Sequence, residues 1–355
     1  MTGLKLQKLR NEMTQHEIEA FLITSEFNLR YITEFTGSSG LAIVTKDDAL
    51  FITDFRYTEQ AAEQVKGFDI IQAKTNLLEE AAAQAMKLGL KTISFEKDFV
   101  TYSTYEQYRE KMDAELKPVS GIIEKIRMIK TPEEVEILKA AAKIADETFE
   151  YICTFIQPGM TELEVSNELE FFMRKQGATS SSFDVIVASG LRSALPHGVA
   201  SEKVIESGDL VTMDFGALYK GYISDITRTV AVGEPSEKLK EIYQIVLEAQ
   251  ELGVEKIAPG MTGYDADAIG RDHIKSKGYG DAFGHSTGHG IGLEVHEGPG
   301  LSFKSQVVLE PGMAVTVEPG IYLPGIGGVR IEDDILITES GNERLTKSTK
   351  ELRIL

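Results

Sequence analysis

Residues 210–232 read LVTMDFGALYKGYISDITRTVAV, in which two strand-like apolar runs flank Tyr219-Lys220-Gly221. This three-residue segment has the composition of a turn, so the stretch is predicted to form an antiparallel β-hairpin. A turn centred between Tyr219 and Lys220 would place Asp214 opposite Asp225 on one face of the hairpin, with their Cβ atoms about 5 Å apart.

Two facing carboxylates repel each other unless a cation or a shared proton compensates the charge. The hairpin therefore predicts either a divalent cation or a pair of carboxyl groups that share a proton. If the turn is misplaced by one residue, one of the two aspartates points to solvent instead. The hairpin alone leaves this alternative open.

A second acidic pair follows the same pattern nearer the C-terminus. Met313–Glu318 and Val329–Thr338 are strand-like runs, and the glycine-rich segment 323–328 between them is predicted to be a loop. A connection centred on Gly325 would place Glu318 opposite Glu332. The four carboxylates of the two hairpins would carry a charge of −4, which two divalent ions would neutralise.

Arg330 precedes Glu332 by two residues, so the two side chains are expected on the same face of their strand. In this position Arg330 could orient a metal-binding carboxylate. An ordinary ion pair across the strands is the alternative, and the two interpretations are compatible.

Four of the six histidines, His197, His285, His289 and His296, are candidates for a functional site. Three of them lie in residues 284–298, GHSTGHGIGLEVHEG, whose glycines argue against a helix and for a backbone that passes close to something. The spacing of His285 and His289 matches a zincin helix, but the catalytic glutamate is missing and Gly288 disfavours the helix. A lone histidine is more often structural, whereas three within twelve residues favour a site. His197 lies in a loop, and its own context decides nothing.

The chain is expected to have two domains, because 355 residues exceed what one core usually supports. The first ~120 residues alternate strand and helix signals, with apolar runs at 20–24 and 41–45. Thr131-Pro132-Glu133-Glu134 is a capping-box pattern that opens a long helix. The predicted domains are residues 1–126 and 127–355. Pro-Gly-Met-Thr occurs at 158–161 and again at 259–262, which suggests an internal duplication, although four residues alone are a weak match.

Composition restricts the classes of function. The net charge of −19 argues against nucleic acid as the main partner. No apolar run is long enough for a membrane span, and the N-terminus lacks the apolar core of a secretory signal. The single cysteine, Cys153, excludes an internal disulfide and is interpreted as a buried thiol. These features together predict a cytoplasmic protein.

The acidic and histidine segments together resemble the family of methionine aminopeptidase, prolidase and aminopeptidase P. The segments that carry the resemblance are MDFGALYKGYISDITRT, GHSTGHGIGLEVHE, VEPGIY and VRIEDD, with residues 28–33 and 35–40 resembling the N-terminal domain of prolidases and creatinases. The resemblance covers essentially the whole chain. It implies an α/β (α+β) protein with a creatinase-like α/β N-terminal domain. The C-terminal domain would have the "pita-bread" fold, a curved antiparallel sheet with pseudo-duplicated halves.

The resemblance also implies a dinuclear metal centre. Asp214 would chelate one ion, Asp225 and Glu332 would bridge both ions, and His289 and Glu318 would hold the other. This oxygen-rich set suits Mn²⁺ or Co²⁺, with Zn²⁺ also possible. Glu318 would shuttle a proton, and His197 and His296 would bind the substrate and stabilise the tetrahedral intermediate. His285 and Tyr322 line the site in relatives.

Within the family, the features of the chain favour an Xaa-Pro dipeptidase. A large N-terminal domain argues against methionine aminopeptidases, and the complete ligand set argues against creatinases. The short chain and the 14-residue spacing from Glu318 to Glu332 resemble small microbial prolidases. The alternatives are an Xaa-Pro aminopeptidase acting on longer peptides, a non-catalytic peptidase-like binding protein and a metal-free amidinohydrolase. Relatives are often homodimers, so a homodimer is expected here.

Overall fold

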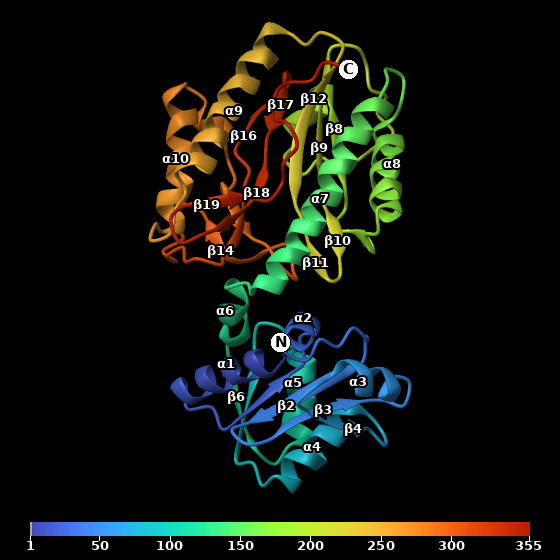
Figure 1. Cartoon of the computed structure of the whole chain (residues 1–355), viewed down its shortest axis with the longest axis vertical. Coiled ribbons are helices and arrows are strands. Elements are labelled where there is room, and N and C mark those ends of the chain that lie inside the picture. The colour runs from blue at the N-terminus through green and yellow to red at the C-terminus, as the bar shows by residue number, and fades with distance from the viewer. Residues whose placement is uncertain (1) are drawn as a thin grey trace. The chain divides into compact units, whose positions relative to one another are not determined.

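The computed structural model describes residues 2–355 and separates into two compact units, the first ending at Arg127 and the second spanning Met128–Leu355 (Figure 1). The first unit contains a six-stranded mixed sheet with the strand order β4-β3-β2-β1-β5-β6. Its strands are β1 (Ala20–Ile23), β2 (Gly40–Thr45), β3 (Ala49–Thr53), β4 (Asp69–Gln72), β5 (Thr92–Glu96) and β6 (Glu115–Val119). Its helices are α1 (Thr2–Gln15), α2 (Glu26–Thr33), α3 (Thr58–Gln64), α4 (Leu77–Lys87), α5 (Tyr102–Lys111) and α6 (Ile122–Met128).

The two apolar runs predicted to be strands in the first unit are confirmed as β1 and β2, which pair antiparallel. All four residues of β1 are buried, as expected for a central strand covered on both faces. The small side chains of Ala81 and Ala85 in α4 belong to the same core cluster as Leu22, Ile43 and Ile52 of the sheet. The first unit therefore has its own hydrophobic core.

The second unit contains antiparallel sheets flanked by helices, as the sequence analysis predicted for the C-terminal part. Figure 1 shows α7 and α8 on one side of its strands and α9 and α10 on the other. Its helices are α7 (Pro132–Phe155), α8 (Glu162–Lys175), α9 (Glu237–Lys256) and α10 (Gly263–Ser276), with 3-10 turns η1 (Gly190–Ala194) and η2 (Gly280–Ala282). Across residues 2–355 there is no helix long and apolar enough to cross a membrane.

The strands of the second unit form two larger sheets, β12-β9-β8 and β14-β13-β15-β18-β19, and two small ones, β11-β10-β7 and β16-β17. In the first half they are β7 (Ser180–Ser181), β8 (Ile186–Ser189), β9 (Asp209–Phe215), β10 (Ala217–Tyr219), β11 (Tyr222–Ile223) and β12 (Ile226–Val232). In the second half they are β13 (Gly288–Gly290), β14 (Glu297–Leu301), β15 (Ala314–Val317), β16 (Gly320–Leu323), β17 (Gly327–Arg330), β18 (Asp333–Ile337) and β19 (Asn342–Arg344).

The repeated Pro-Gly-Met-Thr segments occupy equivalent places in the two halves. Gly159 donates its N–H to the carbonyl of Ile205 at 2.9 Å, and Gly260 donates to the carbonyl of Leu309 at 2.8 Å. In each half the partner donates back to the following methionine, at 2.7 Å and 2.8 Å respectively. Both glycines have φ near +90°, a conformation that glycine adopts without strain, so the repeat of this residue has a backbone cause. The two segments thus share a backbone conformation and a pattern of hydrogen bonds, as an internal duplication would require.

The helices begin with the caps that the sequence predicts. Thr131 and Glu134 form a capping box at the start of α7, and Thr161 and Glu164 form one at the start of α8. In the second half, the threonine of the repeat caps α10 with an aspartate at the matching position. Each cap satisfies backbone N–H groups that the first helical turn leaves without partners.

The predicted register of the first acidic hairpin is wrong by two residues. Asp214 pairs with Thr227 rather than facing Asp225, because the turn residues are Lys220 and Gly221. Both have positive φ, +49° and +86°, as a two-residue turn with the twist of a hairpin requires. A shift of two residues preserves the face to which each side chain points, so both aspartates still face the same side.

The predicted register of the second acidic hairpin is confirmed. Gly320 pairs with Arg330 on one side of the acidic pair, and Val317 pairs with Asp333 on the other. Glu318 and Glu332 lie in the break between these ladders. There the N–H of Glu332 donates to the carbonyl of Thr227 at 3.1 Å, which joins the second hairpin to the first.

Candidate active site

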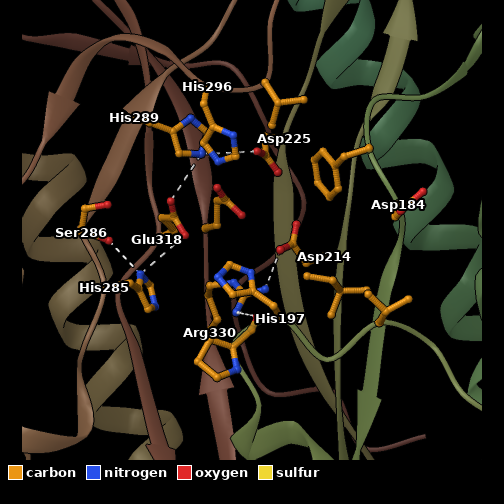
Figure 2. A pocket seen from close by; sticks show the side chains of 16 residues that line it. Asp184, His197, Asp214, Asp225, His285, Ser286, His289, His296, Glu318 and Arg330 are labelled. Carbon is orange, nitrogen blue, oxygen red and sulfur yellow. Dashed lines mark hydrogen bonds and ion pairs between the residues drawn. The ribbon is translucent and has the colours of Figure 1, made fainter.

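A cleft of about 560 Å³ in the second unit is lined by residues from both of its halves (Figure 2). The predicted site residues that line it are Asp214, Asp225, Glu318, Glu332, His197, His285, His289, His296 and Arg330. In Figure 2, Asp214 and Asp225 lie toward one wall, and His285, His289 and Glu318 lie toward the other. Tyr322 does not line the cleft but bonds to two residues that do.

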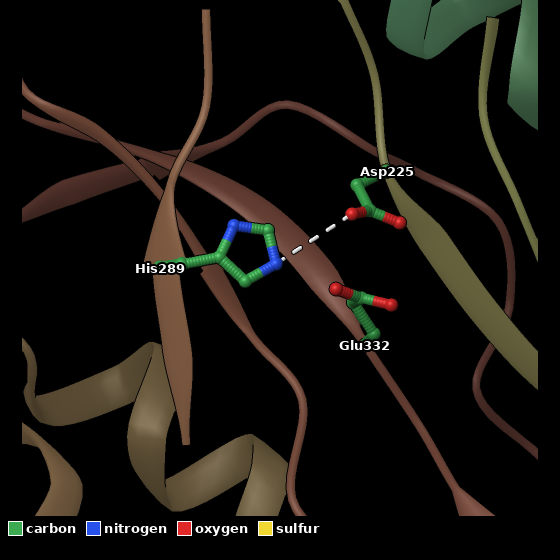
Figure 3. A group of neighbouring side chains, drawn as sticks. All are labelled: Asp225, His289 and Glu332. Carbon is green, nitrogen blue, oxygen red and sulfur yellow. Dashed lines mark ion pairs between the residues drawn. The ribbon is translucent and has the colours of Figure 1, made fainter. Parts of the chain in front are cut away.

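Asp225, His289 and Glu332 form a group that could hold a metal ion (Figure 3). One possible ligand atom from each lies within 4.8 Å of the others. The Nε2 atom of His289 is 3.8 Å from Asp225 Oδ2 and 3.5 Å from Glu318 Oε1. Three segments far apart in the sequence therefore converge on one small volume.

The oxygen atoms of this cleft have the properties expected of cation ligands. Within residues 2–355, the buried Oδ1 atoms of Asp214 and Asp225 have no hydrogen-bond partner. Buried polar atoms are nearly always paired, so each such atom requires an explanation. A divalent cation would satisfy both acceptors and neutralise the carboxylates, so the donor set fits a metal site.

Burial and mutual repulsion hold protons on these carboxyl groups when no cation neutralises them. Burial, and then the nearby Glu332 and Asp214, raise the pKa of Asp225 well above its usual range. Burial, followed by the nearby Glu318 and Asp214, raises the pKa of Glu332 well above its usual range. Burial, with a smaller contribution from Asp214 and against the opposing charge of Arg330, raises the pKa of Glu318 to about 8. Burial, followed by the neighbouring His296, lowers the pKa of His289 to about 4, which keeps its imidazole neutral and able to bind a metal.

Arg330 links several parts of the cleft from a buried position. Its guanidinium donates to Asp214 Oδ2 at 2.5 Å, to the Tyr322 hydroxyl at 2.8 Å and to the Pro196 carbonyl at 3.0 Å. Its Nε donates to Thr227 Oγ1 at 3.0 Å, and this hydroxyl donates to Glu332 Oε2 at 2.6 Å. Arg330 thus forms an ion pair with Asp214 and orients Glu332 indirectly, through Thr227.

His285 and Tyr322 form a hydrogen-bonded pair beside Glu318. His285 Nδ1 lies 2.8 Å from the Ser286 carbonyl, which can only accept, so Nδ1 carries the proton. His285 Nε2 then accepts from the Tyr322 hydroxyl at 2.8 Å. Burial, and then the charge of Arg330, lower the pKa of His285 to about 4, so its imidazole is neutral at pH 7.

Some residues of the site carry no signal that the sequence analysis used. Thr227 orients Glu332, and Asp334 accepts the Asp225 N–H at 2.9 Å. Each lies two residues beyond a predicted ligand, so the strand period could have identified it. The walls also contain Asp184, Ser286, Pro196 and the apolar side chains of Phe183, Ile186, Val199 and Val295.

The metal-free protein should lose stability as the pH rises from 6.5 to 8. The pKa of Glu318 is raised to about 8 in the folded chain, so folding holds a proton that the unfolded chain releases above its ordinary pKa of about 4.3. The stabilisation from this proton is complete below the unfolded-state pKa of Glu318, about 4.3, and it is lost as the pH rises to the folded-state pKa of about 8. The pKa values of His285 and His289 are lowered to about 4 in the folded chain, so these residues make the stability rise with pH. Their effect ends at the unfolded-state pKa of histidine, about 6.5, and does not oppose the loss above that pH.

Thermal unfolding with a chelator would measure this effect, with an expected loss of roughly 1–2 kcal/mol across the interval from Glu318 alone. Asp225 and Glu332 shift in the same direction and add to the slope. The Glu318→Gln variant is the control, because it removes one of the three titrating groups and should flatten the slope. A metal-free stability that rises over this interval would contradict the assignment.

Sequence comparison places the chain in a known family. Residues 136–339 match metallopeptidase family M24, and residues 5–129 match the creatinase/prolidase N-terminal domain. The chain belongs to metallopeptidase family M24, which confirms the resemblance recognised in its sequence. Membership implies divalent metal ions, in agreement with the group formed by Asp225, His289 and Glu332.

Its relatives include proteins named Xaa-Pro dipeptidase and X-Pro aminopeptidase. The chain is 46% identical to the Xaa-Pro dipeptidase of Pyrococcus furiosus, over 98% of this chain and 99% of that one. A solved Xaa-Pro dipeptidase from Bacillus anthracis is 63% identical, covers 100% of both chains and superposes with a TM-score of 0.99. The X-Pro aminopeptidase from Thermotoga maritima is 41% identical over 97% of this chain and all of its own, with a TM-score of 0.91.

Proposed function

We propose that the chain hydrolyses the peptide bond before proline with the help of two divalent metal ions, and that Xaa-Pro dipeptides are its main substrates. The convergence of acidic residues and histidines from both halves on one cleft is the observation that carries the proposal. The names of two relatives, from Pyrococcus furiosus and Bacillus anthracis, support the choice of substrate.

Five side chains would hold the ions. Asp214 would bind one ion, Asp225 and Glu332 would bridge both, and His289 and Glu318 would complete the second site. The buried Oδ1 atoms of Asp214 and Asp225, which have no hydrogen-bond partner among residues 2–355, support this assignment. Four carboxylates and one imidazole favour Mn²⁺, with Co²⁺ or Zn²⁺ as alternatives.

Bound divalent ions supply Lewis acidity at the scissile carbonyl and make water nucleophilic near neutral pH. Glu318 would take a proton from the attacking water and deliver it to the proline nitrogen that leaves. Burial raises the pKa of Glu318 to about 8 in the metal-free chain, which supports a role in holding and delivering a proton. The Oε1 atom of Glu318 lies 3.5 Å from His289 Nε2, next to the group of side chains that could hold a metal ion.

His197 and His296 would contact the substrate and stabilise the oxyanion of the tetrahedral intermediate. His296 lies with its ring centroid 4.3 Å from that of His289, and His197 lines the cleft near Arg330 (Figure 2). The two histidines thus come from different halves of the unit. His285, Tyr322 and Arg330 would act by holding Glu318, Asp214 and the cleft wall in place.

The bond before proline differs chemically from other peptide bonds. It lacks an N–H, and the ring fixes φ, so peptidases that read this N–H or need backbone freedom do not cut it. The trans isomer dominates and exchanges slowly with cis. We therefore propose that only trans substrate is hydrolysed.

Peptides of increasing length test the proposal. With Mn²⁺ present, Xaa-Pro dipeptides should be hydrolysed faster than Xaa-Pro-Xaa tripeptides, and an Xaa-Ala dipeptide should remain uncut. Product amino acids can be quantified by chromatography, with a chelated sample as the control. If no peptide of either length is hydrolysed, the proposal fails.

An Xaa-Pro aminopeptidase is the second candidate, favoured by the likeness to the Thermotoga maritima enzyme of that name. Cleavage of tripeptides without cleavage of dipeptides would establish it. A non-catalytic binding protein would retain metal without hydrolysis. A metal-free amidinohydrolase would remain active in chelator, and the complete set of acidic residues argues against it.

Two further predictions concern the setting of the enzyme. We propose a cytoplasmic protein, supported by the single cysteine, whose sulfur is partly buried and has a pKa raised to about 11 by burial. We also propose a homodimer, supported by the family resemblance alone.

A further inference from the structure

We propose that Glu162 is a positioning residue that fixes His197 in the cleft, an inference that rests on the proposed contact of His197 with the substrate. Glu162 is the first residue of α8 and its side chain is completely buried. A buried carboxylate needs several strong partners to offset the loss of hydration. Within residues 2–355, the hydrogen-bond partners of its carboxylate belong to the His197 loop, residues 190–200, or directly border this loop.

The carboxylate of Glu162 holds both ends of the His197 loop. One oxygen accepts from the N–H and the hydroxyl of Ser189, at 2.8 Å and 2.9 Å. The other accepts from the N–H and the hydroxyl of Ser201, at 3.1 Å and 2.7 Å. Ser189 directly precedes the loop and Ser201 directly follows it, so a single side chain closes the loop.

Arg192 connects the same carboxylate to the interior of the loop. Its Nε donates to Glu162 Oε2 at 3.0 Å, and its Nη2 donates to the Val199 carbonyl at 2.7 Å. On the other side of His197, the Pro196 carbonyl accepts from Arg330 at 3.0 Å. The backbone on each side of His197 is therefore tied to a charged group.

The imidazole of His197 depends on this backbone support. The rings of His285 and His289 have hydrogen bonds to backbone carbonyls, whereas none from residues 2–355 holds the ring of His197. Its place in the cleft is thus set by the loop. A displacement of about 1 Å of a catalytic group can reduce a rate on the order of 100-fold.

The Glu162→Gln variant tests the inference. The amide keeps the size of the side chain but replaces one acceptor oxygen with a donor, which would oppose the donors at one end of the loop. We expect kcat for Xaa-Pro cleavage to fall about 10- to 100-fold. Bound metal should be unchanged, because Glu162 touches none of the five proposed ligands.

The matched control is Glu164→Gln, because Glu164 lies in the same first turn of α8, two residues after Glu162. Glu164 caps α8 by accepting from the Thr161 N–H at 2.7 Å, and within residues 2–355 it has no hydrogen bond to the His197 loop. This variant should lose helix stability and keep its kcat. An equal loss of kcat in both variants would show that Glu162 only stabilises α8, and would overturn the inference.

A double-mutant cycle with His197→Ala shows whether Glu162 acts through His197. If it does, Glu162→Gln should reduce kcat little further once His197 is gone. Losses that simply add would overturn the inference. If Glu162→Gln does not fold, Ser201→Ala removes one hydrogen bond at the end of the loop and should reduce kcat in the same direction, and an unchanged kcat there would likewise overturn it.

Histidine NMR provides a readout that does not depend on catalysis. The ring signal of His197, assigned by its loss in His197→Ala, should shift or broaden in Glu162→Gln and stay in place in Glu164→Gln. An unmoved signal in Glu162→Gln would overturn the inference even if the chain proves inactive on Xaa-Pro peptides. Absence of Xaa-Pro cleavage in the unaltered protein, with a moved signal, would instead refute the proposed function alone.

Discussion

Replacing Asp225 with asparagine should abolish metal binding at one or both sites and reduce peptidase activity by more than about a thousandfold, equivalent to ~4 kcal/mol of barrier. Asp225 is the carboxylate that would bridge both ions, and it belongs to the group whose ligand atoms lie within 4.8 Å. An amide has one neutral oxygen and carries no charge, so it cannot replace a bridging carboxylate. Elemental analysis of the purified variant and hydrolysis of an Xaa-Pro dipeptide measure the two effects.

The stability of the metal-free variant separates loss of the site from loss of the fold. Burial and the nearby Glu332 and Asp214 raise the pKa of Asp225, so folding of the metal-free protein must bury a charge or take up a proton there, and the neutral amide avoids this cost. The metal-free Asp225→Asn protein should unfold at the same temperature as the unaltered metal-free protein or above it. It should gain little stability from added Mn²⁺.

Asp184→Asn is the matched control for this substitution. Asp184 lines the same cleft but is exposed and lies outside the metal group, so this variant should keep its bound metal. Near-normal activity in Asp225→Asn, or equal loss of metal in both variants, would refute the ligand assignment.

Arg228→Met should cost about 3–5 kcal/mol of the free energy of unfolding, the usual penalty for breaking a buried ion pair. Arg228 is 1% exposed, and its Nη2 donates to Asp333 Oδ1 at 2.7 Å and to the Ser348 carbonyl at 3.0 Å. Its remaining donors reach the carbonyls of Thr227, Glu332 and Thr349. Methionine would leave these acceptors and part of the Asp333 charge without partners inside the protein.

Denaturant unfolding of the metal-free protein would measure this loss. Arg353→Met is the matched control, because Arg353 forms a partly exposed ion pair with Glu150 at 2.8 Å, and exposed pairs contribute about 0–1 kcal/mol. Losses of similar size in the two variants would contradict the importance of the buried network. Lys350, whose Nζ lies 3.1 Å from Asp333 Oδ2, would still neutralise part of the Asp333 charge in Arg228→Met. The expected loss of unfolding free energy is therefore toward the lower end of roughly 3–5 kcal/mol.

The sequence predicted local features well where glycines define the backbone. The register around Gly325 was correct because this residue, with φ of +79°, sits at the centre of the connection. The register around Lys220 was wrong because a lysine with positive φ is uncommon and its side chain gives no sign of it. The error had little consequence for the predicted site, because a register shift of two residues leaves Asp214 and Asp225 on the same face of the hairpin.

The supporting residues could not be predicted because their roles come from contacts between distant segments. Thr227 bonds to a glutamate 105 positions away, and the Asp225 N–H reaches an aspartate 109 positions away. Glu162 could be placed at the start of a helix from its sequence. Nothing in the sequence shows that the His197 loop closes around it.

The proposed ligands come from both halves of the second unit, which bears on how that unit holds together. Asp214 and Asp225 belong to the first half of this unit, whereas His289, Glu318 and Glu332 belong to the second, so the proposed ions would lie between the two halves. Each half would supply only part of the proposed ligand set. Bound ions would therefore cross-link the two halves as well as take part in the reaction. Without the ions, the halves would be joined by the backbone and by side-chain packing.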